Sequence, residues 1–179
     1  SVQYFFGMQV AGVYQNSAEV SADPIAVTNS LEPGDFKYVD QNNDGVLDDQ
    51  DRVDLGSYLP SLNYGGNVQA SYKNFDLSVA LSGQAGNKIL NRRRGEVNFT
   101  NDTNIDADLA INRWHGEGTS NTHVSSKGRR KGWNQKMNSF LVEDGSFFRI
   151  QNIQLGYTIP KNTFLGENMP EAKITFTGG

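Results

Sequence analysis

One stretch of the sequence carries oxygen-bearing side chains at a spacing that could bind a metal ion. Residues 40–51 read DQNNDGVLDDQD, and a calcium loop of this length supplies ligands from its first, third, fifth, seventh, ninth and twelfth positions. Gly45 falls on the sixth position, where such a loop turns sharply. The ligand positions hold Asp40, Asn42, Asp44, the carbonyl of Val46, Asp48 and Asp51. The spacing therefore predicts a structural calcium site, with Asp51 in the place of the usual, longer Glu.

The segments on either side of this loop decide what a bound calcium ion could do. A calcium sensor of the helix–loop–helix type needs a helix before the loop and another after it. Before the loop stands EPGDFKYV, which contains Pro33 and Gly34, and after it stands RVDLGSYLP, which contains Gly56 and Pro60. Because these segments do not favour helices, we expect calcium to stiffen a loop between strands. The alternative is a turn rich in Asp, Asn and Gly that binds no metal.

Alternating apolar and polar residues dominate the rest of the chain, and this period of two predicts β-strands. The strand candidates are residues 2–14, 62–72, 75–82, 147–159 and 172–177. Lys73 and Asn74 form a two-residue turn between the second and third candidates. One short helix is expected at Asp106–Trp114, with Asp106 as its cap. The predicted fold class is therefore all-β, with antiparallel, up-and-down strands.

The connections between these strands differ greatly in length. Those after the first and third candidates are long, whereas the second and third candidates are joined by two residues. Short turns on one side and long loops on the other are typical of outer-membrane β-barrels. Aromatic residues gather at strand ends, as an interfacial girdle requires, although aromatic residues also favour strands in general. These residues are Tyr4, Phe5, Phe6, Tyr14, Tyr72, Phe75, Phe147, Phe148 and Tyr157.

The composition excludes several classes of function. The 179 residues carry a net charge of -4, without the basic face that a nucleic-acid-binding protein needs. The sequence has no cysteine, which excludes disulfides and cysteine-based zinc sites, and no apolar run long enough for a transmembrane helix. It holds no Ser/His/Asp arrangement and no phosphate-binding loop, so we expect no enzymatic activity. Its abrupt start within a strand candidate predicts a segment of a longer chain.

Two further groups of residues in the second long connection could contact a substrate. Basic side chains cluster at residues 92–94 and 129–131, where they could bind an anionic substrate or a lipopolysaccharide phosphate. Tryptophan rings in the same connection could stack on sugars, since large rings anchor interfaces. The substrate-binding candidates are Trp114, Trp133 and Arg93. The alternatives are a solvated basic loop and ordinary packing of the two tryptophans.

Four blocks of the sequence, taken in order, carry a resemblance to a known family. They are YFFGMQVAGVYQNSAEV at residues 4–20, PGDFKYVDQNNDGVLDDQDRVDLGSYLPSLNYGG at 33–66, SYKNFDLSVALSGQAGNKILN at 71–91 and NSFLVEDGSFFRIQNIQLGYTIPK at 138–161. The second block, which contains the calcium-type loop, is the most recognisable of the four. Together they resemble the SusC/RagA family of TonB-linked outer-membrane transporters of the Bacteroidetes.

The resemblance implies a large transmembrane β-barrel of about 22 strands with long extracellular loops. Residues 1–179 would form a C-terminal part of that barrel, without the plug domain and without the closing strands. The implied partners are a SusD-like surface lipoprotein and the TonB complex, and the implied substrate is a glycan or a peptide. The implied location is the cell outer membrane.

A soluble all-β surface binding module with a structural calcium loop is the alternative. The two interpretations, a barrel segment and a soluble module, differ in the direction in which one set of apolar side chains points. A barrel directs them toward lipid, whereas a soluble module buries them. The set comprises Tyr64, Val68, Tyr72, Leu77, Val79 and Leu81.

Overall fold

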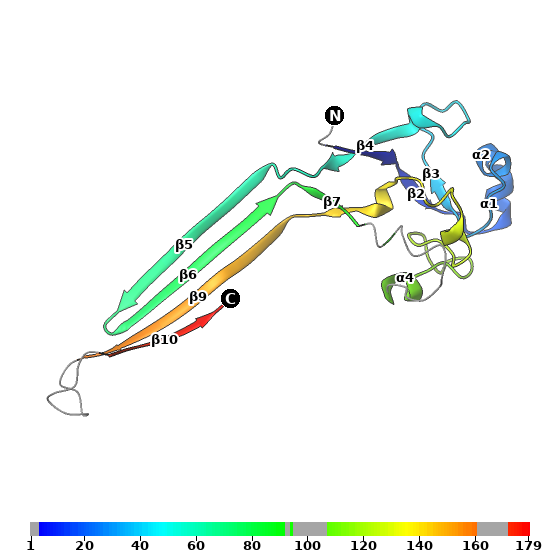
Figure 1. Ribbon diagram of the computed structural model, residues 1–179. Helices are drawn as coiled ribbons and strands as arrows, with labels where there is room; N and C mark the ends of the chain where they lie inside the picture. Colours follow the sequence, from blue (N-terminus) through cyan, green and yellow to red (C-terminus); the bar gives the residue numbers. More distant parts are fainter. Residues whose placement is uncertain (1–3, 92–93, 95–106, 161–171) are drawn as a thin grey trace. The chain divides into compact units, whose positions relative to one another are not determined.

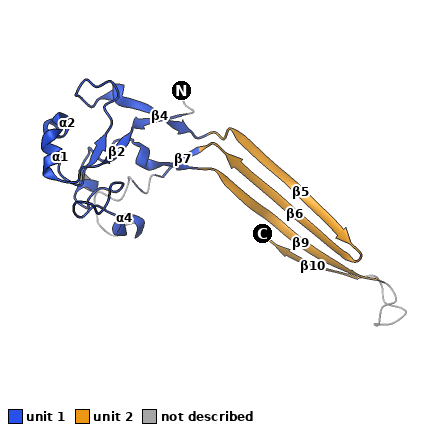
Figure 2. Cartoon of the chain, turned by 180° about the vertical axis from the view of Figure 1, so that it is seen from behind, with its two compact units in different colours: residues 1–58, 88–144 blue, residues 59–87, 145–179 orange. Residues whose placement is uncertain are grey.

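The computed structural model describes residues 4–91, 94, 107–160 and 172–179. The chain divides into two compact units, which Figure 2 colours separately. Unit 1 comprises residues 1–58 and 88–144, and unit 2 comprises residues 59–87 and 145–179. Each unit is therefore built from two separate stretches of sequence. No described helix is long and apolar enough to cross a membrane.

Unit 2 is a single antiparallel sheet of long strands. Its strands are β5 (Leu62–Tyr72), β6 (Phe75–Ala85), β9 (Phe147–Ile159) and β10 (Ala172–Gly178). They lie in the order β10-β9-β6-β5, so each strand lies beside its neighbours in sequence order (Figure 1). The predicted up-and-down arrangement is confirmed, and the bounds of β5 and β9 coincide with the expected ones. The two-residue turn is also present, with Lys73 at a left-handed φ of 54°.

A β-bulge interrupts the pairing of β6 with β9. Ala80 lies opposite Asn152 but Leu81 lies opposite Ile150, which leaves Gln151 as the extra residue. A bulge of this kind shifts the alternation by one residue. Ile150 therefore points to the same side of the sheet as Ile153, which simple alternation along β9 would forbid.

The described residues of unit 1 form three short antiparallel strand pairs. The pairs are β1 (Tyr4–Met8) with β4 (Arg52–Ser57), β2 (Val10–Val13) with β3 (Phe36–Tyr38), and β7 (Lys88–Leu90) with β8 (Val142–Asp144). The prediction of one continuous strand over residues 2–14 is wrong for residues 4–14, which are the ones that the structure describes. The strand breaks at Gln9, because β1 and β2 pair with different partners.

The first long connection contains two helices that the sequence analysis did not predict. It folds into the helices α1 (Ser17–Ala22) and α2 (Pro24–Thr28). Asn16 caps α1 and Asp23 caps α2, each by accepting a backbone N–H with its side chain. A further helix, α4 (Ala107–Ile111), lies within the expected span Asp106–Trp114, whose first residue is outside the described part. Short 3-10 turns occupy Asp49–Asp51, Gly128–Arg130 and Ser139–Leu141.

Unit 1 has its own small hydrophobic core. One cluster consists of Met8, Val13, Phe36, Tyr38 and Val124. A second cluster consists of Tyr14, which follows β2, Ala26 of α2, and Leu31. The Tyr14 hydroxyl donates a hydrogen bond of 2.6 Å to the carboxylate of Asp23. Burial, together with this hydrogen bond, raises the pKa of Tyr14.

Candidate functional site

The sheet of unit 2 sorts its side chains by polarity onto two faces. The register places one set of paired residues on what we call the apolar face. It comprises Leu62, Tyr64, Gly66, Val68, Ala70 and Tyr72 of β5; Phe75, Leu77, Val79, Leu81, Gly83 and Ala85 of β6; Phe148, Ile150, Ile153, Leu155, Tyr157 and Ile159 of β9; and Ala172, Ile174, Phe176 and Gly178 of β10. The six residues expected on one side of a barrel wall all belong to this face.

The apolar face is exposed rather than packed on a core. Val68 is 56% exposed, Leu77 38% and Phe176 70%. A soluble domain rarely leaves so large a contiguous apolar surface uncovered. The 11 residues of β5 extend for roughly 35 Å at about 3.3 Å per residue. A strand of this length, tilted by about 45°, spans the apolar band of about 25 Å in an outer-membrane barrel.

Aromatic residues form two rows across the apolar face, one toward each end of the strands. Near the Lys73–Asn74 turn, the rings of Phe75 and Tyr157 lie 4.7 Å apart between their centroids. Toward the other end, the rings of Tyr64 and Phe148 stack at 6.4 Å. Between the two rows, β6 and β9 carry only aliphatic residues on this face: Leu77, Val79, Leu81, Ile150, Ile153 and Leu155. This is the arrangement of aromatic girdles that flank a lipid-facing band.

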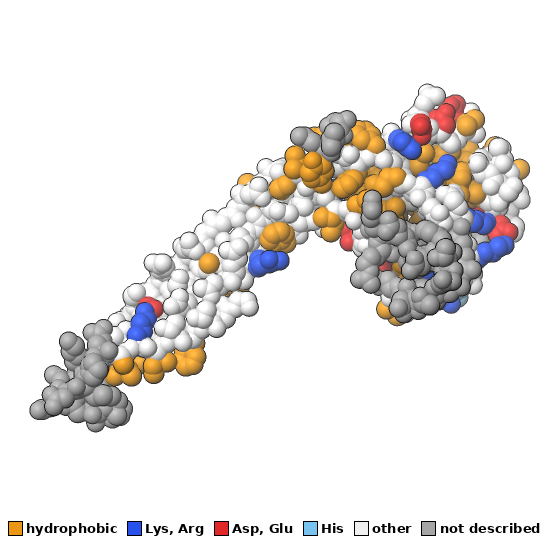
Figure 3. All heavy atoms as spheres, in the orientation of Figure 1, with side chains coloured by type: hydrophobic (Ala, Val, Ile, Leu, Met, Phe, Trp, Pro, Cys, Tyr) orange, Lys and Arg blue, Asp and Glu red, His pale blue; other side chains and the backbone are white. Residues whose placement is uncertain are grey.

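The opposite face of the sheet, which we call the polar face, carries mainly amides and hydroxyls. It comprises Asn63, Gly65, Asn67, Gln69 and Ser71; Asp76, Ser78, Ala80, Ser82 and Gln84; Phe147, Arg149, Asn152, Gln154, Gly156 and Thr158; and Lys173, Thr175 and Thr177. Asp76 and Lys173 form an ion pair of 2.9 Å. A Cβ on Gly156 would collide with both of their side chains, so this glycine lets the pair span β9. The space-filling view in Figure 3 shows few charged side chains on the visible face of this sheet.

The calcium-type loop of residues 40–51 connects two strands, β3 and β4. The prediction that it is not flanked by helices is confirmed. The carboxylate of Asp40 accepts the backbone N–H groups of Asn43 and Gly45 at 2.7 and 2.9 Å. Asn42 and Asp44 accept the N–H groups two residues further along. Gly45 has a φ of 79°, as the sharp turn at the sixth position requires.

The last two predicted ligands of this loop play a structural role. Asp48 and Asp51 form a capping box, in which each side chain accepts a backbone N–H. Asp51 is fully buried and also accepts the N–H of Gln41 at 2.9 Å. The side chain of Val46 is exposed. Among the described residues, no three acidic or histidine side chains lie close enough together to bind one metal ion.

The two tryptophan candidates pack into unit 1. Trp133 lies between the two core clusters, and its Nε1 donates to the carbonyl of Phe36 at 2.8 Å. Its ring also contacts that of Tyr38 at 5.3 Å. Trp114 packs on the first cluster, with its Nε1 buried and lacking a partner among the described residues. Packing alone therefore accounts for the position of both rings.

The basic clusters are partly neutralised. Arg92 and Arg93 lie outside the described residues, as does the side chain of Arg130. Arg94 pairs with Glu143 at 2.9 Å and with Asp108 at 3.5 Å. Hydrogen bonds from Asn112 and His123 lower the pKa of Asp108.

Lys131 pairs with the buried Asp35 at 2.7 Å and with Glu32 at 3.1 Å. Partial burial opposes the charge of Lys131, but the hydrogen bonds to Asp35 and Glu32 outweigh it and raise its pKa. Hydrogen bonds from Lys127 and Lys131 lower the pKa of Glu32. Arg94 and Lys131 are therefore better explained as structural cations than as binders of an anionic substrate.

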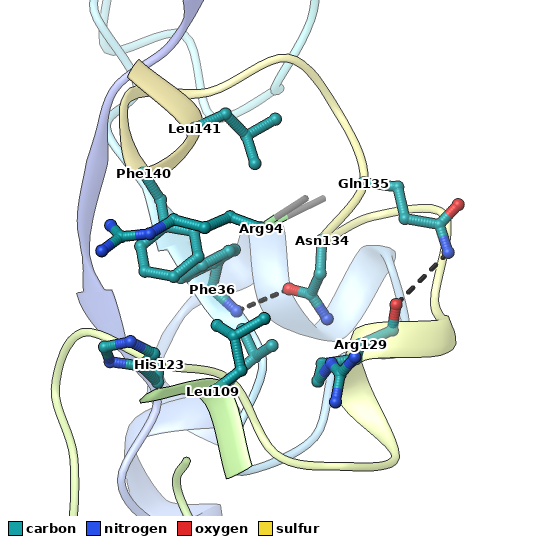
Figure 4. A pocket seen from close by; sticks show the side chains of 10 residues that line it. Phe36, Arg94, Leu109, His123, Arg129, Asn134, Gln135, Phe140 and Leu141 are labelled. Atoms are coloured by element: carbon teal, nitrogen blue, oxygen red, sulfur yellow. Dashed lines mark hydrogen bonds between the residues drawn. The ribbon is translucent and has the colours of Figure 1, made fainter. Parts of the chain in front are cut away.

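Figure 4 shows a cavity in unit 1 beside Arg94 and His123. Its volume is about 20 Å³, which is of the order of one water molecule. The Arg94 guanidinium lies 5.0 Å from the ring centre of Phe140, and Asn134 accepts the N–H of Phe36 at 2.7 Å. The cavity is too small for a sugar or a peptide.

Sequence reasoning missed the polar network that holds unit 1 together. Asn134 donates to Asp35 at 2.9 Å and to the carbonyl of Gly128 at 2.7 Å. Asn138, which is fully buried, donates to the Tyr38 hydroxyl at 3.2 Å. Asn134 and Asp35 are about a hundred positions apart in the sequence, as are Asn138 and Tyr38. No local pattern could have paired them.

The sequence of this chain was compared with family models and with curated proteins. No family model matches it. The TonB-dependent receptor P26 of Formosa agariphila is 31% identical over 178 residues, which is 99% of this chain and 18% of that protein. The TonB-dependent receptor P3 of the same organism is 32% identical over 165 residues, which is 91% of this chain and 16% of that protein. The chain thus spans less than a fifth of the length of these relatives.

The fold is similar to that of solved transporters. The RagAB peptide transporter matches with a TM-score of 0.62 and 18% identity, over 97% of this chain and 18% of that one. The RagAB peptide importer in its open-open state matches with a TM-score of 0.60 and 24% identity, over the same shares. These proteins are described as receptors, transporters and importers, which confirms the prediction of no enzymatic activity. The chain therefore belongs to the TonB-dependent receptors of the outer membrane, as a segment with the fold of the SusC/RagA-type barrels.

Proposed function

We propose that the whole protein imports a nutrient across the outer membrane, with energy supplied through the TonB complex. The observation that carries this proposal is the two-faced sheet of unit 2. Its apolar face meets lipid and its polar face lines the interior of the barrel. The short Lys73–Asn74 turn then lies at the periplasmic side, and unit 1 belongs to the extracellular loops.

The soluble binding module is disfavoured by the same sheet. Such a module would have to bury the apolar face, whose residues remain exposed. Tyr72, for example, is 71% exposed and Phe148 61%. Both belong to the aromatic rows, which suit a lipid interface better than a protein core.

We propose a SusD-like surface lipoprotein as partner and a glycan or a peptide as substrate. The SusC/RagA-type sequence blocks support the partner, as does the likeness to a transporter described as RagAB. That transporter carries peptides, which supports a peptide substrate, whereas the family resemblance supports either class. A Bacteroidetes-type outer membrane agrees with the Formosa relatives.

We also propose that the loop of residues 40–51 binds calcium as a structural ion. The spacing of its oxygens supports this, together with the turn at Gly45. The side chains of Asp40, Asn42, Asp44 and Asp48 lie at or near the surface, so small rotations could direct them toward an ion. Bound calcium would stiffen the link between β3 and β4.

Uptake by whole cells tests the proposed function. The gene for the full-length receptor is deleted, and in a second strain TonB is removed. Uptake of labelled oligosaccharide and peptide mixtures is then compared with that of the parent strain. We expect both deletions to abolish uptake of the same class of solute. Unchanged uptake of every solute in the receptor deletion would contradict import.

A further inference from the structure

His123 lies within a cluster of charged side chains in unit 1. Its Nε2 lies 3.3 Å from the carboxylate of Asp108 in α4, and its Nδ1 lies 2.8 Å from the Thr122 hydroxyl oxygen. The His123 side chain is only 12% exposed. Each of these contacts joins two residues of unit 1, so the cluster is formed by the described residues themselves.

Both charge states of His123 keep these two hydrogen bonds. A neutral ring donates through one nitrogen and accepts through the other, and the Thr122 hydroxyl serves as donor or acceptor. A protonated ring donates through both nitrogens, to the Asp108 carboxylate and to the Thr122 oxygen. Hydrogen bonds from Asn112 and His123 hold the pKa of Asp108 below its ordinary value of 3.8, so Asp108 is ionised where histidines titrate. Protonation of His123 therefore adds an ionic attraction without the loss of a hydrogen bond.

The charged groups around His123 differ in how directly they act on it. Asp108 is in direct contact and attracts a protonated ring. Arg94 opposes this attraction, since its guanidinium lies 3.5 Å from the same carboxylate. Arg94 makes its shorter contact, of 2.9 Å, with Glu143 of β8, which offsets its charge. Arg129 lines the same cavity, on the side away from His123 in Figure 4. The direct contact with Asp108 is therefore the dominant one.

The helix α4 depends on tertiary contacts for its order. It has five residues, and a helix this short is not stable on its own. Leu109 provides its buried apolar contact, and the adjacent Asp108 provides the polar contact with His123. Just after the helix, the backbone N–H of Trp114 donates to the carbonyl of His123 at 3.1 Å. Weakening of the contact between Asp108 and His123 therefore acts directly on α4.

We propose that His123 is a pH-sensitive clasp, which holds α4 against unit 1 through Asp108 more firmly when the ring is protonated. Histidine is the side chain that ordinarily changes its charge between about pH 5 and 8. A cation that gains an anionic partner on folding contributes stability at low pH, and this contribution is lost as the pH rises through its titration range. The clasp is thus firm in a mildly acidic medium and weaker in an alkaline one. Because unit 1 belongs to the extracellular loops in the proposed arrangement, the medium outside the cell sets the order of α4.

Hydrogen–deuterium exchange of the purified full-length receptor in detergent tests the clasp. Exchange of the backbone amides of residues 107–114 is measured at about pH 5.5 and about pH 7.5, with times scaled for the intrinsic effect of pH on exchange. The test variants are His123→Gln and Asp108→Asn. The matched control is His115→Gln, because His115 is the other of the two histidines in this chain and contacts a neutral group, the carbonyl of Arg113, at 3.1 Å. Peptides from β5 and β6 report whether each variant is folded.

After this scaling, residues 107–114 should exchange about two- to fivefold more slowly at the lower pH, which is the size expected of a partly exposed ion pair. His115→Gln should keep this difference, whereas His123→Gln and Asp108→Asn should both lose it. Absence of a difference in the unsubstituted receptor overturns the clasp, as does an equal difference in His123→Gln. A difference of the same size in the β5 and β6 peptides also overturns it, because the effect of pH would then be global.

Failure of the clasp is distinguishable from failure of the proposed function. The exchange experiment measures the order of α4 and requires no transport, so its result stands whichever solute the receptor imports. If deletion of the receptor leaves the uptake of every solute unchanged, the import function is wrong and the clasp is unaffected.

Discussion

The ring of Tyr64 lies across Gly83, filling the space where any other residue would place its Cβ. The Tyr64 hydroxyl donates to the carbonyl of Phe147 at 3.1 Å, so the side chain reaches from β5 over β6 to β9. Its ring also stacks on that of Phe148. One glycine thus allows a tyrosine to fasten three strands within an aromatic row of the apolar face.

Substitution of Gly83 by Ala should displace this tyrosine. The added methyl group would overlap both the Tyr64 ring and the backbone carbonyl oxygen of Phe147, so the ring would have to rotate away and β9 would have to shift. Overpacking of this kind costs about 1–3 kcal/mol. Gly66→Ala is the matched control, because its Cβ would meet nothing within 4 Å. Urea unfolding of the full-length protein in lipid vesicles should show loss of stability in Gly83→Ala alone, and equal stability of both variants would refute the role of Tyr64.

Removal of the Lys131 charge should destabilise unit 1 more than removal of a neighbouring charge. Lys131→Met leaves the carboxylate of Asp35, which is 1% exposed, without its cation. Because Lys131 is itself partly exposed, we expect a loss of about 1–3 kcal/mol. Lys127→Met serves as control: its side chain is 75% exposed, and surface pairs contribute about 0–1 kcal/mol. Limited proteolysis of the full-length protein compares the two variants, and equal resistance would count against a structural role for Lys131.

The pKa shifts in unit 1 predict loss of stability at both extremes of pH. The pKa of Glu32 and that of Asp108 are lowered in the folded protein, so their contribution is present above the unfolded value and disappears as the pH falls through the folded one. The pKa of Lys131 is raised above its ordinary value of 10.5, so its contribution disappears as the pH rises through the folded value.

Protease resistance measured against pH should therefore fall in acid below about 4 and in alkali above about 10.5. Glu32→Gln should reduce the acid-induced loss. An acid response that is identical in Glu32→Gln and in the unsubstituted protein would show that Glu32 does not contribute.

Calcium binding is predicted to depend on Asp44 and not on Asp49. Asp44 stands at the fifth position of the loop, whereas Asp49 stands at a position without a ligand role and pairs with Arg52 at 3.2 Å. Titration of the calcium-free, full-length protein should give binding heat that Asp44→Ala abolishes and Asp49→Ala preserves. Absence of heat in the unsubstituted protein would rule out the site.

The long strands could be predicted from the sequence because alternation alone determines them. From Leu62 to Tyr72 every second residue is apolar or glycine, and the opposite face carries none of the large apolar residues. The bulge at Gln151 could not be predicted, since it depends on the register with β6. The break at Gln9 likewise depends on which strands β1 and β2 pair with.

The helices α1 and α2 were missed because each is too short for helical periodicity to appear. Their capping residues can nevertheless be identified in the sequence. Asn16 precedes α1, Asp23 precedes α2, and Pro24 is the first residue of α2. The calcium-type loop could be located from its spacing. The structural role of Asp51 could not be predicted from the spacing, because the burial of its carboxylate arises from tertiary packing.

The central claim, that the unit 2 sheet is part of a lipid-facing barrel wall, is tested most directly by spin labelling along β6. The chain has no cysteine, so single cysteines can be introduced at successive positions from Leu77 to Ser82, with any cysteines elsewhere in the full-length protein replaced by serine. Collision with oxygen, which dissolves in lipid, is then compared with collision with a water-soluble nickel complex. We predict high oxygen accessibility at Leu77, Val79 and Leu81, and low oxygen accessibility at Ser78, Ala80 and Ser82. Protection of the apolar positions from both reagents, as burial in a soluble module would give, would contradict the claim.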